Sequence, residues 1–266
     1  MGFATGSPFS NIRDEKNGGQ GMIHHYGPSD HQIVEIIRPG NPRENGGLIV
    51  LVHGGYWRAK FDRTLMNPIA HDLTSRGWCV ANVEYRRTGA EGGWPITADD
   101  VRTAILFVRK WAAEQDIHGP FIGVGHSVGG QLALLAAAGL DAVVALAPVT
   151  DVARADREGL GENAAREFMR ASSNDAPREY ADASPICQLP LNKPQLLVHG
   201  DIDARVPVAH TRDFQAAAHA RGDEAKLIIV PQMGHLDAID PAADHWPPVL
   251  QWLGEITAAS GKPFAS

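Results

Sequence analysis

The segment Gly125-His126-Ser127-Val128-Gly129 decides the fold, because the sequence predicts a buried strand before it and a helix after it. A short apolar run, residues 120–124, precedes the segment, and residues 131–138 are rich in strong helix formers. In this context a Gly-x-Ser-x-Gly pentapeptide matches the nucleophile elbow, a tight turn that exposes a serine hydroxyl. The two glycines avoid clashes with the neighbouring strand and helix. An ordinary tight turn is the alternative interpretation of the same five residues.

Composition excludes several classes of function. The chain has 266 residues, enough for one large α/β domain that buries most of its apolar surface. Its formal net charge of −7 argues against a nucleic-acid partner, because a phosphate backbone requires a dense basic surface. The two cysteines, Cys79 and Cys187, match neither a disulfide framework nor a metal-binding motif. This cysteine usage fits a reducing compartment, and we expect a cytoplasmic protein.

The ends of the chain and its apolar runs give no sign of a membrane protein. Residues 1–21 are polar and glycine-rich and lack the basic and apolar regions of a secretory signal, so we interpret them as a flexible N-terminal arm. No apolar stretch reaches the roughly 18 residues of a membrane-spanning helix, and no membrane partner is expected. Residues 260–266 are interpreted as a C-terminal tail. The oligomeric state is left open, with a homodimer as one option.

Apolar runs and helical patterns alternate along the rest of the chain. Repeated strand-helix-strand units imply parallel pairing, right-handed crossovers and helices on both faces of one sheet. We therefore predict a single α/β domain over residues 22–259, with an eight-stranded, mostly parallel sheet. The predicted strands are 22–26, 31–37, 48–52, 78–83, 120–124, 142–146, 195–199 and 226–230. The predicted helices are 64–76, 97–115 with Thr97 as its cap, 131–138, 208–221 and 242–259.

Residues 149–190 interrupt this alternation. The segment is charged, contains prolines and offers only short helical patches such as residues 163–170. We interpret it as a small cap over the site.

A serine hydroxyl is a poor nucleophile at neutral pH, so Ser127 needs a base and a third group that orients the base. His235 follows the last predicted strand, and Asp203 follows the strand before it. All three residues lie at the carboxyl ends of strands, where open α/β sheets place their sites. The chain order Ser, Asp, His is that of the α/β-hydrolase fold. Asp201 competes with Asp203 for the third position, and a single histidine among 12 would mean little alone.

Acyl transfer also needs donors for the oxyanion that forms on the carbonyl oxygen. The glycine-rich segment after the strand 48–52 offers backbone N–H groups that no side chain shields, and the start of the elbow helix offers another. We assign this oxyanion hole to Gly55, Tyr56 and Val128. A plain turn after the strand is the alternative for the glycine pair.

No metal or cofactor is expected. The sequence lacks His-Glu-x-x-His, Cys-x-x-Cys and a glycine-rich phosphate loop. His24 and His25 are adjacent, so their side chains point to opposite faces of a strand. Trp57 and Trp94 are candidates for substrate contacts, although tryptophans in a domain of this size more often serve packing.

Four motifs together resemble the α/β-hydrolase superfamily: His-Gly-Gly-Tyr-Trp at 53–57, Gly-His-Ser-Val-Gly-Gly at 125–130, Asp-Ala-Arg-Val-Pro at 203–207 and Gly-His at 234–235. Within it, His-Gly-Gly-x-Trp resembles the kynurenine formamidase (arylformamidase) and carboxylesterase branch. Further landmarks of that branch are similar to Tyr85-Arg86-Arg87, Trp94-Pro95 and Asp99-Asp100-Val101. The likeness covers roughly residues 48–253. It implies a serine hydrolase that acts on a small ester or an aryl N-formyl amide.

Two departures bear on the substrate. Tyr56 stands where hormone-sensitive-lipase-like esterases have a third glycine, which favours the formamidase-like subgroup, and Val128 replaces the alanine usual in formamidases. Three functional hypotheses follow. The chain is a carboxylesterase or arylformamidase-like hydrolase, a peptidase or amidase on the same scaffold, or a binding module that has lost turnover. A peptidase usually carries an added gating domain, for which residues 149–190 are short, and a binding module would be expected to lack an intact triad.

Overall fold

The computed structural model describes residues 21–43 and 46–260, and within them eight strands form one sheet. The spatial order of the strands is β1-β2-β4-β3-β5-β6-β7-β8. Pairing is antiparallel between β1 and β2 and between β2 and β4, and parallel for every other pair. This arrangement confirms the predicted α/β-hydrolase fold. The strands are β1 (Met22–His25), β2 (Ile33–Ile37), β3 (Leu48–Val52), β4 (Cys79–Val83), β5 (Phe121–His126), β6 (Ala142–Leu146), β7 (Gln195–Gly200) and β8 (Ala225–Val230).

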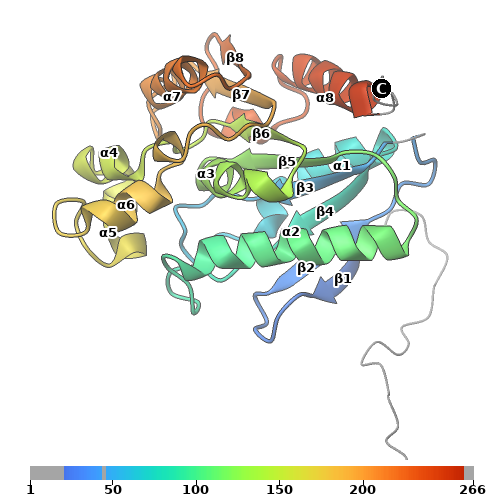
Figure 1. Ribbon diagram of the computed structural model, residues 1–266, viewed down its shortest axis with the longest axis horizontal. Helices are drawn as coiled ribbons and strands as arrows, with labels where there is room; N and C mark the ends of the chain where they lie inside the picture. Colours follow the sequence, from blue (N-terminus) through green and yellow to red (C-terminus); the bar gives the residue numbers. More distant parts are fainter. Residues whose placement is uncertain (1–20, 44–45, 261–266) are drawn as a thin grey trace, which may run out of the picture.

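Helices cover both faces of the sheet and divide the core into two layers (Figure 1). On one face, α2 (Ile96–Glu114), α3 (Val128–Leu135) and α7 (Ala209–Ala220) pack through residues such as Val101, Leu132 and Phe214. On the other face, α1 (Asn67–Ser75) and α8 (Trp246–Ser260) pack through residues such as Leu73 and Leu253. The central strand β3 is buried throughout, and its alternate side chains enter opposite layers. A strand covered in this way must be apolar on both faces, which explains its continuous apolar sequence.

The chain between β6 and β7 leaves the sheet. It forms three short helices, α4 (Val152–Arg157), α5 (Leu160–Met169) and α6 (Pro177–Ala183), and a 3₁₀ turn, η3 (Pro185–Cys187). Figure 1 shows α4, α5 and α6 gathered at one end of the molecule. These helices occupy the segment 149–190, and its function as a cap stays a prediction.

Some helix ends differ from the predictions. Thr97 does not cap α2, which begins at Ile96 after Pro95; instead the Thr97 hydroxyl donates to the Arg86 carbonyl at 2.7 Å. The last helix starts at Trp246 rather than near residue 242. The first helix divides into a 3₁₀ turn, η1 (Arg63–Met66), and α1. The predicted arm at residues 1–21 and the tail at 260–266 lie almost entirely outside the described residues. None of the helices in the described part of the chain is both long and apolar enough to cross a membrane.

Candidate active site

Ser127 occupies the sharp turn between β5 and α3, with φ 56° and ψ −121°. Residues other than glycine rarely adopt this conformation, and such strain typically costs about 1–3 kcal/mol. The surrounding backbone holds the turn in place. The Ser127 N–H donates to the Leu146 carbonyl of β6 at 2.8 Å, and the Ser127 carbonyl accepts from Val149 N at 3.3 Å. Strain retained in this way at a serine is the backbone signature of the predicted elbow.

The glycines of the elbow are required by space. A Cβ atom on Gly129 would lie 2.1 Å from the Val52 carbonyl oxygen, and one on Gly125 would lie 2.2 Å from the Gly129 carbonyl oxygen. Both neighbours are backbone atoms of packed elements and cannot move aside. The motif therefore reflects the close approach of α3 to β3 and β5.

Asp203 and His235 are joined by a hydrogen bond, as expected for the second and third members of a triad. The distance from His235 Nδ1 to Asp203 Oδ2 is 2.7 Å. Asp203 lies in the loop after β7, and His235 lies just before a 3₁₀ turn, η4 (Leu236–Ile239), that follows β8. Both are largely buried, at 9% and 7% exposure. The orientation of His235 by a carboxylate leaves its Nε2 as the free ring nitrogen for proton transfer.

The Asp203 carboxylate is surrounded by donors. Its Oδ1 accepts from the backbone N–H groups of Arg205 at 2.8 Å and Val206 at 3.0 Å. Its Oδ2 also lies 3.2 Å from Nε2 of His199, which is fully buried. Burial raises the pKa of Asp203, but the contacts with His199, His235 and the Val206 N–H outweigh it and hold that pKa well below its usual range. Asp203 is therefore ionised at neutral pH.

Asp201, the rival candidate, has a different task. It is exposed, and its Oδ1 accepts the Gln232 N–H at 2.7 Å. It thus joins the loops that follow β7 and β8. The structure brings Asp203, rather than Asp201, to His235.

The elbow and the His235 loop are in direct contact. Nε2 of His126, the residue before Ser127, lies 3.0 Å from the carbonyl oxygen of His235, and the two imidazole rings are 4.7 Å apart. Because the acceptor is a carbonyl, the His126 Nε2 carries the proton. In the described residues no hydrogen bond joins the Ser127 hydroxyl to the His235 ring. Such bonds are often long before substrate binds and tighten in the complex.

The predicted oxyanion loop has an unusual backbone. Gly55, Tyr56 and Trp57 follow β3 with φ of 116°, 57° and 56°. Within the described residues, neither the Tyr56 N–H nor the Val128 N–H has a protein acceptor. The two groups thus remain available to a ligand oxygen. A Cβ atom on Gly54 would lie 3.1 Å from the Ser127 Cβ, so the loop passes directly beside the nucleophile candidate.

A buried polar network that the sequence did not predict supports this loop. The His53 ring is within hydrogen-bonding distance of the Gly54 carbonyl (Nδ1, 2.6 Å) and the Glu84 carboxylate (Nε2, 3.0 Å), and it stacks on the Tyr85 ring at 4.3 Å. Glu84 also pairs with the buried Arg87. Although burial raises the pKa of Glu84, the contacts with His53 and Arg87 lower it overall. The signal was a glutamate directly after the apolar strand 79–83.

The two tryptophan candidates lie in the packing next to the loop. Trp57 is 2% exposed, stacks on Phe168 at 4.6 Å and donates to Gln131 at 2.9 Å. Trp94 is partly exposed and meets Phe168 edge-on at 6.2 Å. Trp57 therefore fixes the loop against α5, and a substrate contact of either residue stays a prediction.

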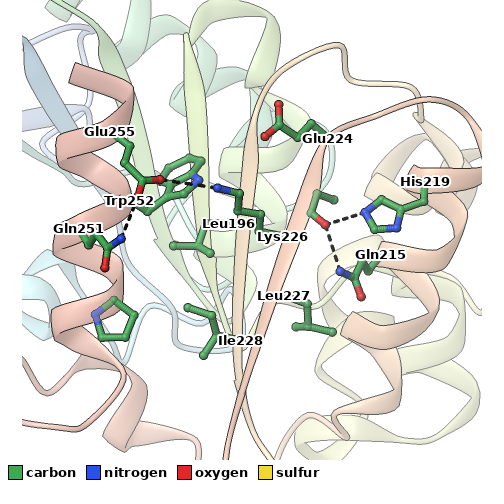
Figure 2. A pocket seen from close by; sticks show the side chains of 12 residues that line it. Leu196, Gln215, His219, Glu224, Lys226, Leu227, Ile228, Gln251, Trp252 and Glu255 are labelled. Atoms are coloured by element: carbon green, nitrogen blue, oxygen red, sulfur yellow. Dashed lines mark hydrogen bonds and ion pairs between the residues drawn. The ribbon is translucent and has the colours of Figure 1, made fainter. Parts of the chain in front are cut away.

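Across residues 21–43 and 46–260, no group of three or more His, Cys, Asp and Glu side chains could hold a metal ion. A cavity of about 550 Å³ lies at the edge strand β8, between α7 and α8. Figure 2 shows Gln215 and His219 of α7 on one side of β8, and Gln251 and Glu255 of α8 on the other. Its lining includes Leu196 and Lys226, at the amino ends of β7 and β8. The cavity is therefore at the opposite end of these strands from Ser127 and His235.

Comparison with known proteins gives a consistent result. A family model described as BD-FAE matches residues 34–218, more than half of the chain. The esterase LipQ of Mycobacterium tuberculosis (strain ATCC 25618 / H37Rv) is 29% identical over 220 residues, which cover 74% of this chain and 52% of that protein. The chain thus spans about half the length of this curated relative.

Solved structures share the fold. A truncated carbohydrate esterase from gut microbiota superposes with a TM-score of 0.79 at 20% identity, covering 89% of this chain and 95% of that one. The thermophilic esterase Est2 of Thermogutta terrifontis superposes with a TM-score of 0.72 at 21% identity, covering 93% and 95%. Est2 has also been determined phosphonylated by sarin.

Proposed function

The chain belongs to the BD-FAE family, and on that basis we propose that it is a serine carboxylesterase that cleaves small carboxylic esters through an acyl-enzyme. The observation that carries the proposal is the Asp203–His235 hydrogen bond, together with a serine in strained backbone, at the carboxyl ends of β5, β7 and β8 of one sheet. Relatives named as esterases point to the same reaction. Each part of the site has one role in it.

The first step is acylation. His235 takes the proton of the Ser127 hydroxyl through Nε2 as the oxygen attacks the ester carbonyl carbon, and Asp203 stabilises the resulting imidazolium. The tetrahedral intermediate then collapses. The bond to the alcohol oxygen breaks, and His235 returns the proton to the leaving alcohol. In deacylation His235 takes a proton from the attacking water. The second tetrahedral intermediate collapses, the bond between the acyl carbon and the Ser127 oxygen breaks, and His235 returns the proton to that oxygen as the carboxylic acid leaves.

The oxyanion of both tetrahedral intermediates needs preorganised donors. The N–H groups of Tyr56 and Val128 lack protein acceptors in the described chain, and the Gly55 N–H belongs to the same partly exposed turn as Tyr56. Donors of this kind typically contribute about 2.7–4 kcal/mol each to transition-state stability. The His53–Glu84 contact fixes the start of the loop, so these donors need not reorganise during the reaction.

Hydrolysis of an aryl N-formyl amide is a second candidate. Tyr56 favours it, because this tyrosine stands where hormone-sensitive-lipase-like esterases have a third glycine. Its φ is 57°, a value that glycine adopts more easily than other residues. The same triad would serve, because both reactions pass through a tetrahedral oxyanion.

One panel of substrates tests the proposal. The wild-type protein and Ser127→Ala are assayed with p-nitrophenyl acetate, N-formylkynurenine and an aminoacyl anilide. Ester turnover that Ser127→Ala abolishes is the expected result, and turnover of the formyl amide alone would select the second candidate. Cleavage of the anilide would indicate a peptidase or amidase. Wild-type protein that cleaves none of the three would contradict the proposal and favour a binding module.

A further inference from the structure

His199 is a fully buried histidine that the reaction scheme above does not use, although it touches the triad carboxylate. It lies near the carboxyl end of β7, four residues before Asp203. Its Nε2 is 2.9 Å from the Val206 carbonyl oxygen and 3.2 Å from Asp203 Oδ2. Its Nδ1 is 2.6 Å from the Thr211 hydroxyl of α7. The ring therefore links the strand, the Asp203 loop and the next helix.

These partners determine which ring nitrogen carries the proton. The Val206 carbonyl and the Asp203 carboxylate are both acceptors only, so the His199 Nε2 must be the donor. The Thr211 hydroxyl can then donate to Nδ1, which satisfies both nitrogens of a neutral ring. The N–H group is shared between two acceptors, with Val206 as the nearer one.

The contact of His199 with the Val206 carbonyl reinforces its contact with the Asp203 carboxylate. The Val206 N–H donates to Asp203 Oδ1 at 3.0 Å, while the Val206 carbonyl accepts from His199 at 2.9 Å. His199 consequently restrains both carboxylate oxygens, one directly and one through the backbone of Val206. A rotation of the carboxylate away from His235 would break both contacts.

We propose that His199 is a positioning residue, which holds the Asp203 carboxylate in the orientation that His235 requires and limits the negative charge on Oδ2. The kinetic consequences of this inference rest on the proposed function, whereas its structural consequences do not. A buried carboxylate that accepts two imidazole N–H groups at one oxygen shares its charge between them. Loss of His199 would loosen Asp203 and concentrate its charge on the remaining partner.

Other titratable groups also lie near His235 in the described part of the chain. His126 faces it from β5, and Arg205 belongs to the same loop as Asp203. On its own turn, the Asp237 carboxylate accepts the Gly234 N–H at 2.7 Å. None of these groups is altered by a substitution at His199.

The test compares His199→Leu with His199→Gln. Leucine fills the space without a donor, whereas the glutamine amide can donate toward Asp203 and accept from Thr211. We expect His199→Leu to lower kcat about tenfold, the effect of losing one hydrogen bond to a charged group, with KM unchanged. Because more charge on Oδ2 favours the protonated His235 ring, the acidic limb of the kcat/KM profile moves to higher pH. His199→Gln should restore most of the lost kcat and most of the original pH profile.

His245→Leu is the matched control. His245 is also buried, but within the described residues the hydrogen bond of its ring joins Nε2 to the Ala238 carbonyl alone, at 3.1 Å. Its loss should leave the pH profile unchanged. Thr211→Val removes the partner of Nδ1 and should move the acidic limb in the same direction as His199→Leu, by a smaller amount, which keeps the test decisive if His199→Leu does not fold.

A readout that needs no turnover separates this inference from the proposed function. We expect the proton between His235 and Asp203 to give a strongly deshielded ¹H NMR resonance, which its loss in Asp203→Asn would identify. We expect it to shift in His199→Leu and to return toward its original position in His199→Gln. An unchanged resonance and pH profile in His199→Leu, or equal losses in the leucine and glutamine variants, would overturn the inference. A wild-type protein that is inactive on esters, together with a shifted resonance in His199→Leu, would contradict only the proposed function.

Discussion

The side chains of Asp201 and Asp203 are two residues apart, yet their surroundings differ completely. Asp201 is exposed and joins two loops through the Gln232 N–H. Asp203 is buried, ionised and bonded to His235 at 2.7 Å. The pair therefore offers a matched comparison, within one loop, of a structural carboxylate and the carboxylate proposed to be catalytic.

Asp203→Asn should lower kcat by about 10⁴-fold, because an amide can donate to Nδ1 and select the wrong tautomer of His235. Asp201→Asn should retain most of the activity. We would measure steady-state ester hydrolysis by the two variants. Thermal unfolding would verify that both are folded. Equal losses would mean that the loop, and not the Asp203 carboxylate, carries the effect.

Burial of His126 predicts a pH-dependent stability. Burial, aided by the nearby His235, lowers the pKa of His126 from 6.5 to about 3. Between these pH values the unfolded chain binds a proton that the native ring does not, so the free energy of unfolding rises with pH. His126→Gln keeps a donor for the His235 carbonyl but does not titrate. Between pH 7 and pH 5 the wild type should lose about 2 kcal/mol more stability than this variant.

Urea unfolding at the two pH values measures the difference. His71→Gln, at an exposed position of α1, is the control and should follow the wild type. Parallel losses in the wild type and His126→Gln would show that the buried ring is not responsible.

At the scale of the elements, the decisive contact is the crossing of α3 over β3 and β5 at the elbow. A methyl group on Gly129 would meet the Val52 and His53 carbonyl oxygens at 2.1 and 2.3 Å. By contrast, a methyl group on Gly254, within α8, would meet nothing within 4 Å. The two glycines thus have opposite consequences when replaced by alanine.

We expect Gly129→Ala to destabilise the protein by about 3 kcal/mol, the upper part of the range for overpacked cores, and to abolish activity by displacing Ser127. Gly254→Ala should stabilise it by about 0.5–1 kcal/mol, because alanine is the better helix former. Denaturant unfolding of both variants measures whether each substitution lowers or raises the free energy of unfolding. A neutral Gly129→Ala would mean that the elbow is looser than its contacts indicate.

The sequence predicted the elements well where the determinants are local. The continuous apolar run 48–52 and the glycine-flanked Ser127 define a buried strand and a turn within a few residues. Thr97 was misplaced because its hydroxyl bonds to Arg86, a residue outside the helix that no local pattern reveals. Helix ends depend on such tertiary partners and are therefore the least predictable part of an element.

At the scale of the whole molecule, the sheet order explains which candidate residues could be placed from the sequence and which could not. The positions of Ser127, Asp203 and His235 could be predicted because each follows a recognisable strand, and parallel strands deliver their carboxyl ends to one edge. The contacts of Glu84 and His199 could not be predicted. Glu84 reaches His53 across 31 residues, and His199 reaches Thr211 on another element. Only the folded arrangement brings these partners together.

The most direct test of the triad is the reaction of the intact protein with a fluorophosphonate, followed by mass-spectrometric mapping of the modified peptide. Phosphonylation requires both an accessible serine and a base that activates it. We predict one phosphonyl group, on Ser127, and much slower labelling in His235→Asn. An adduct on a different residue, no adduct at all, or labelling of Ser127 at the same rate in His235→Asn would contradict the assignment of Ser127 and His235 as nucleophile and base.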